Sequence, residues 1–97
     1  MNEDEAILQV LDILSREKEG EDYIRKDKPI KVRDVRNTVK SQFALDIKPF
    51  CIEEVAKAIG FNITRIEEGY SAIEVTEAQL SKLLPVDSYG NRMRRDI

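Results

Sequence analysis

The chain has 97 residues, with 41% hydrophobic and 36% charged side chains, and its formal net charge at pH 7 is −3. This length supports one domain with one core, and the hydrophobic fraction is too high for wholesale disorder. Because the overall balance is negative, no general basic field attracts nucleic acid, and any such attraction must come from a local patch.

The sequence contains no His and a single Cys. His is the usual general base near neutral pH and the commonest zinc ligand, and a lone Cys forms neither an internal disulfide nor a thiolate metal site. No apolar run approaches the ~20 residues of a membrane span, and the acidic start MNEDEA is the reverse of a signal peptide. We therefore expect a cytoplasmic protein that is not an enzyme and that uses no metal or cofactor.

Residues 3–18 are predicted to form the first helix, with Asn2 as its N-cap and acidic residues in its first turn. Apolar positions spaced i, i+3, i+4 and i+7 predict a buried stripe of Ile7, Val10, Leu11 and Leu14. Leu8 and Ile13 flank this stripe on either side. Either a neighbouring loop covers these two side chains, or they form a homodimer interface along the helix.

The stretch 19–29 is polar and is punctuated by Gly20 and Pro29, so it predicts a loop. The next three residues, 30–32, read IKV and predict a short strand.

A second helix is expected over residues 33–44. At 100° per residue, Arg33, Arg36 and Lys40 lie within about 60° of one another, and Asn37 borders them. This is the most ordered basic feature of the chain. It is either a solvated helix flank or a surface that binds a polyanion.

A Pro and a Gly delimit the third helix. Pro49 suits the first helical position and Gly60 suits the residue after the last turn, so the helix is predicted over 49–59. Its inward face holds Ile52, Val55, Ala56 and Ile59, and its outward side carries Glu53, Glu54 and Lys57.

After the third helix the apolar period changes to two, which predicts a β-hairpin over 61–76 with its turn at Gly69. Thr76 is then the N-cap of a fourth helix over TEAQLSKLL, with Gln79 placed as in a capping box, and Pro85 ends that helix. One domain over 1–86 follows, with 87–97 as a mobile basic tail.

The stretch IKVRDVRNTVKSQFALDIKPFCIEEVAKAIGF resembles the winged helix-turn-helix pattern. That pattern has an Ile/Val-rich lead-in, a helix ending near an aromatic residue, a buried turn residue before a Pro, and a recognition helix closing on Ile-Gly-Phe. The corresponding residues are Ile30, Val32, Phe43, Ile47, Pro49 and Ile59-Gly60-Phe61. The resemblance covers about residues 5–84 and implies an α+β, mostly α fold. Such domains occur in small archaeal and bacterial DNA-binding regulators and in C-terminal modules of replication proteins, and some bind other proteins.

The resemblance assigns the outward face of residues 50–58 to the DNA major groove and residues 65–71 to the wing. DNA-binding members usually carry Arg, Lys or neutral polar residues there, whereas this chain carries Glu53, Glu54, Glu67 and Glu68. Since phosphate attraction supplies most non-specific affinity, we expect DNA contacts to shift to other cations and their polar neighbours. The candidate nucleic-acid-binding residues are Lys31, Arg33, Arg36, Asn37, Lys40, Lys48, Lys57, Arg65, Arg92, Arg94 and Arg95.

Two functions are therefore open. The first is a non-enzymatic protein that binds double-stranded DNA in transcription or replication, as a monomer or as a homodimer through Leu8 and Ile13. The second is a protein–protein interaction module in which the acidic third helix and wing meet a basic partner. Cations gathered on one side of the molecule favour DNA, and a dominant acidic ridge favours a protein partner.

Overall fold

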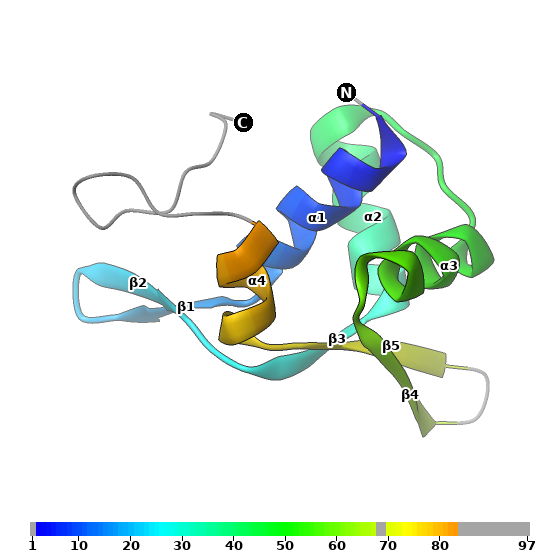
Figure 1. Ribbon diagram of the computed structural model, residues 1–97. Helices are drawn as coiled ribbons and strands as arrows, with labels where there is room; N and C mark the ends of the chain where they lie inside the picture. The colour runs from blue at the N-terminus through cyan, green and yellow to red at the C-terminus, as the bar shows by residue number, and fades with distance from the viewer. Residues whose placement is uncertain (1, 68–69, 84–97) are drawn as a thin grey trace.

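Along the chain, single helices or pairs of helices are separated by two or three short antiparallel strands. The computed structural model describes residues 2–67 and 70–83, and these form a mostly helical α+β fold with four helices, a two-stranded sheet and a three-stranded antiparallel sheet (Figure 1). The elements are α1 (Glu3–Leu14), β1 (Arg16–Glu19), β2 (Asp22–Arg25), β3 (Lys28–Lys31), α2 (Val32–Phe43), α3 (Pro49–Ile59), β4 (Asn62–Glu67), β5 (Tyr70–Val75) and α4 (Glu77–Leu83). The three helices α1, α2 and α3 lie on one side of the sheet β3-β5-β4 (Figure 1).

The limits of α3 agree with the prediction, because a proline begins the helix and a glycine ends it. Pro49 occupies the first turn, where its missing N–H is not needed. Gly60 has a φ of 116°, in the left-handed region that favours glycine, and its N–H donates to the carbonyl of Ala56 at 3.1 Å.

Side chains cap two other helices as expected. The N–H of Glu5 donates to Asn2 Oδ1 at 2.8 Å, and the N–H of Gln79 donates to Thr76 Oγ1 at 3.1 Å. The predicted capping box is only half formed, however. The amide of Gln79 does not return to the N-cap residue but donates to the carbonyl of Ile59 at 3.3 Å, and so joins α4 to the end of α3.

The predicted loop over 19–29 and the predicted end of the first helix at residue 18 are both wrong. The helix α1 ends at Leu14, and the next residues form an antiparallel hairpin in which Arg16 lies opposite Arg25 and Glu19 opposite Asp22. The hairpin turns at Gly20, whose φ is 64°. All four residues of β1 are charged, and the two apolar residues of β2 are adjacent, so the apolar alternation that identifies a strand is absent from the sequence. Figure 1 shows this hairpin projecting away from the helices.

A partly buried ion pair anchors the hairpin to α1. The guanidinium of Arg16 lies 2.6 Å from the carboxylate of Asp12, and the Asp12 residue is only 2% exposed. Burial lowers the pKa of Arg16 below its ordinary value. The N–H of Lys26 also donates to the carbonyl of Ser15 at 2.9 Å, which closes the base of the hairpin.

The hairpin predicted over 61–76 is confirmed, and the structure adds a third strand to it. Strand β5 lies between β4 and β3, with Ile73 directly opposite both Ile63 and Ile30. Cross-strand partners share one face of a sheet, so these three side chains form a row. They belong to, or pack against, the core cluster, which places this face of the sheet toward the helices.

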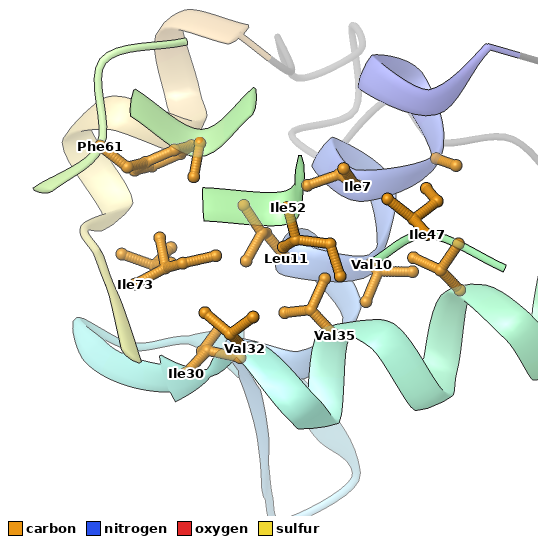
Figure 2. Close-up of a cluster of buried hydrophobic side chains, with 14 of the residues drawn as sticks. Ile7, Val10, Leu11, Ile30, Val32, Val35, Ile47, Ile52, Phe61 and Ile73 are labelled. Carbon is orange, nitrogen blue, oxygen red and sulfur yellow. The ribbon is translucent and has the colours of Figure 1, made fainter. Parts of the chain in front are cut away.

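The core lies between that face of the sheet and the helices α1, α2 and α3 (Figure 2). It is built mainly from branched aliphatic side chains, together with Ala6, Ala56 and the aromatic ring of Phe61. The residues labelled in Figure 2 are Ile7, Val10, Leu11, Ile30, Val32, Val35, Ile47, Ile52, Phe61 and Ile73.

Replacing Ile73 tests whether the central strand supports the core. Ile73 is fully buried, so we expect Ile73→Ala to lower the free energy of unfolding by about 2–5 kcal/mol through lost burial and the cavity left behind. Ile63→Ala is the matched control, because Ile63 lies opposite Ile73 but is only half-buried on an edge strand. Urea denaturation followed by circular dichroism measures both, and equal losses would contradict the assigned core.

Candidate nucleic-acid interface

Positive charge is concentrated in the segment that runs from β3 to the start of α3. Residues 28–48 contain six cationic and two anionic side chains, a local charge of +4, within a chain whose net charge is −3. The segment includes the whole of α2 and the turn that follows it. One continuous stretch of the sequence therefore carries the local excess of positive charge that an anionic chain needs to attract nucleic acid.

The helix α2 presents its cations beside its buried face. Val35 and Val39 are fully buried, whereas Arg33 and Lys40 are exposed. Asn37, between these two cations in the chain, is exposed as well. Arg33 and Lys40 are seven residues apart, about 10 Å along the helix axis at ~1.5 Å per residue. We call the residues Arg33, Arg36, Asn37 and Lys40 the α2 flank.

Arg36 is the least accessible member of the α2 flank. It is half-buried, and its guanidinium lies 3.3 Å from a carboxylate oxygen of Asp46 in the turn between α2 and α3. The side chains of Arg36 and Asp46 are 41% and 65% exposed, so water screens the pair and its contribution to stability is small. The pair nonetheless orients Arg36 toward the turn and offsets part of its charge.

Arg33 contacts the β4–β5 hairpin through an aromatic ring. Its guanidinium carbon lies 5.2 Å from the centre of the Tyr70 ring, within the range of a cation–π interaction. Tyr70 begins β5, and Arg33 is the second residue of α2, so the contact joins the hairpin to the start of the cationic helix. This pair is not apparent from the sequence, because 37 positions separate the two residues and only the pairing of β3 with β5 brings their elements together.

Lys31 and Arg65 do not share a face of the sheet. Lys31 is opposite Ala72, and Arg65 is opposite Ser71, the residue of β5 that directly precedes Ala72. Successive residues of a strand point to opposite faces, so the two cations are directed to opposite sides of β5. The structure therefore separates these two candidates.

The outward side of α3 is balanced rather than cationic. Lys48 is exposed immediately before the helix, and Lys57 is exposed within it. The ammonium of Lys57 lies 3.8 Å from a carboxylate oxygen of Glu54, one turn earlier, and Glu53 is half-buried beside it. Glu53 and Glu54 thus lie on this side as expected, but Lys48 and Lys57 accompany them, and Lys57 already has an acidic neighbour.

Other predicted residues are half-buried or lie outside the described part of the chain. Leu8 and Ile13 are both half-buried, and Leu8 packs against the core cluster, so the homodimer through these residues remains a prediction. The predicted turn at Gly69, the acidic residue Glu68 and the end of α4 at Pro85 lie outside the described residues. So do the tail cations Arg92, Arg94 and Arg95.

Residues 2–67 and 70–83 contain no group of three or more acidic, His or Cys side chains that could hold a metal ion. The helices of this part are all too short or too polar to cross a membrane.

A double-mutant cycle tests the contact between Arg33 and Tyr70. Both side chains are exposed, so we expect a coupling energy of about 0.5–1 kcal/mol from the single variants Arg33→Ala and Tyr70→Ala and their combination. Denaturant unfolding measures it. Tyr70→Phe keeps the ring and should retain most of the coupling, while additive effects of the two alanine substitutions would show that the contact is not formed in solution.

Compared with known proteins, the chain matches no family model, no curated protein and no solved structure. The geometry of the α2 flank and of the neighbouring hairpin is thus the basis on which a function is assigned.

Proposed function

We propose that this chain is a winged helix-turn-helix protein that binds double-stranded DNA, with α2 rather than α3 carrying most of the phosphate contacts. The observation that supports this most directly is the exposed cationic flank of α2 within an anionic chain. Two helices across a short turn followed by an antiparallel hairpin agree with the resemblance noted above, which also suggests a role in transcription or replication.

The α2 flank has the chemistry that a phosphate backbone requires. Arg33 and Lys40 are exposed cations about two helical turns apart, and a DNA strand carries one phosphate per ~3.4 Å of duplex axis, so the flank can reach more than one phosphate. Asn37 between them offers neutral hydrogen bonds to phosphate oxygens. Arg36 contributes less, because Asp46 offsets its charge.

The outward side of α3 is poorly suited to lead the docking. Glu53 and Glu54 would approach the phosphates together, and like charges brought close in an interface cost up to several kcal/mol. A single carboxylate can still accept from the amino group of cytosine. The balance therefore favours affinity from the α2 flank, with Tyr70 holding Arg33 beside the wing.

The alternative, a protein-interaction module, is supported by a different observation. Phe50 of α3 is 69% exposed beside the acidic residues of that helix. A basic partner would then bind α3, and the α2 flank would have no part in binding. The two functions make different predictions for substitutions in α2.

Titration with a random-sequence duplex at several salt concentrations tests the proposal. We expect the association constant to fall as the salt concentration rises. The slope of its logarithm against the logarithm of salt concentration reflects the number of phosphates contacted. Lys40→Ala should weaken binding and reduce the magnitude of that slope by about 1, since one phosphate contact is lost. Circular dichroism should show an unchanged fold, because Lys40 is exposed.

Lys18→Ala is the matched control for this titration. Lys18 is exposed, but it lies on β1, in the hairpin that projects away from the helices. Its removal changes the net charge by the same amount and should leave the slope unchanged. The proposal fails if the unmodified chain shows no salt-sensitive binding at micromolar protein, or if Lys18→Ala and Lys40→Ala behave alike.

A further inference from the structure

Phe50 is the most exposed large hydrophobic side chain among the described residues, at 69%. It lies in the first turn of α3, directly after Pro49. The buried residues of this helix are Ile52 and Ala56, and at 100° per residue Phe50 falls on the opposite side. The core of this chain therefore gives no reason for an aromatic ring at this position.

The exposed side of α3 carries one aromatic, two charged and one small side chain along the helix. Phe50, Glu54 and Lys57 follow the spacing i, i+4, i+7, and Cys51 and Ala58 are exposed beside them. We call Phe50, Glu54, Lys57 and Ala58 the α3 stripe. It offers one large apolar side chain at the start of the helix and a small one near its end.

The charges along this surface are balanced and have a defined order. Lys48 precedes the helix, Glu53 and Glu54 lie near its middle, and Lys57 follows them, so two cations match two anions. A surface without net charge is unsuited to a polyanion. It can instead complement a copy of itself, provided that the copy runs in the opposite direction.

An antiparallel pair of α3 helices brings Lys57 close to Glu53 and Glu54 and covers Phe50. With the twofold axis near residue 55, Lys57 of each copy lies opposite Glu53 and Glu54 of the other. The same symmetry places each Phe50 over the C-terminal end of the partner helix, beside the small exposed Ala58. Because a twofold interface repeats every contact, one favourable pair is always present twice.

From this complementarity of charge and size we infer that α3 is the surface on which a second copy of this chain docks. The inference does not rest on DNA binding, since it uses the side of α3 and not the α2 flank. An 11-residue helix is about 16 Å long. A pair of such helices buries less than the ~1,200 Å² at the lower limit of specific interfaces, so the homodimer is weak and forms only at high protein concentration.

The α3 stripe also offers more exposed apolar surface than the homodimer surface expected on α1. Leu8 and Ile13 are half-buried in the chain itself, whereas Phe50 is largely exposed. Burying Phe50 against a partner removes an aromatic ring from water, which is the contribution that anchors many interfaces.

Sedimentation equilibrium up to millimolar protein tests the inference, with charge reversal as the probe. The unmodified chain is expected to show a monomer–dimer equilibrium. Glu54→Lys and Lys57→Glu should each weaken self-association by about tenfold or more, because like charges then face each other across the twofold axis. An equimolar mixture of the two variants should form a heterodimer.

The mixture separates contacts between copies from contacts within one helix. Glu54 and Lys57 are also neighbours in the same helix. If the double variant E54K/K57E regained self-association, the gain could therefore come from contacts within one helix or from contacts between two copies. In the mixture each chain keeps its own like-charged pair, and residues 54 and 57 are complementary only between the two chains. Phe50→Ser should abolish both the homodimer and the heterodimer, with the fold unchanged because the side chain is exposed.

Three results would overturn the inference. The first is a chain that stays monomeric at millimolar concentration, and the second is a dimer that is insensitive to Phe50→Ser and to the charge reversals. The third is a loss of affinity for random-sequence duplex in Phe50→Ser at concentrations where the chain is monomeric, since the α3 stripe would then belong to the DNA site.

Discussion

The pairing of β3 with β5 is the constraint on which the arrangement of the surface depends. It joins residues 28–31 to residues 72–75, so the strand that leads into α2 lies in the same sheet as the hairpin that follows α3. The centre of this pairing is the row of Ile30, Ile73 and Ile63, whose burial against the helices fixes the register. A slip of one residue would turn these side chains away from the core, so the position of the cations is fixed by hydrophobic burial and not by their own contacts.

Charge is distributed unevenly because of this packing. The ion pairs on the surface are individually weak: the partners in Arg36–Asp46 and Lys57–Glu54 are each more than two-fifths exposed. Such pairs do not determine the fold, but they decide which cations keep their full charge. Arg36 and Lys57 are partly offset by acidic neighbours. What distinguishes the α2 flank is therefore accessible charge, and not the number of cations.

The sequence predicts best where single residues fix the backbone or where apolar periodicity is clear. Pro49 and Gly60 limit α3 correctly, and the period of two after α3 predicts the β4–β5 hairpin. It fails over residues 15–25, where neither strand of the hairpin shows apolar alternation and the ion pair between Asp12 and Arg16 is not apparent from periodicity. Exposed cations on α2 follow from helical spacing alone. The contact of Arg33 with Tyr70, and the separation of Lys31 from Arg65, need the register of the sheet, which no local pattern contains.

The two helices around the α2–α3 turn differ in what they can bind, and this difference follows from their charges. A helix flank with a local excess of cations gains from counterion release at every phosphate that it contacts. A helix whose cations are matched by anions gains nothing of this kind, and its association depends on an apolar anchor and on the order of its charges. Phe50 supplies such an anchor on α3, and no exposed aromatic residue lies on α2 within its described length, Val32–Phe43, where Phe43 is half-buried. One small fold thus has two chemically distinct surfaces, a cationic flank on α2 and a face of α3 with matched charges and an exposed aromatic ring.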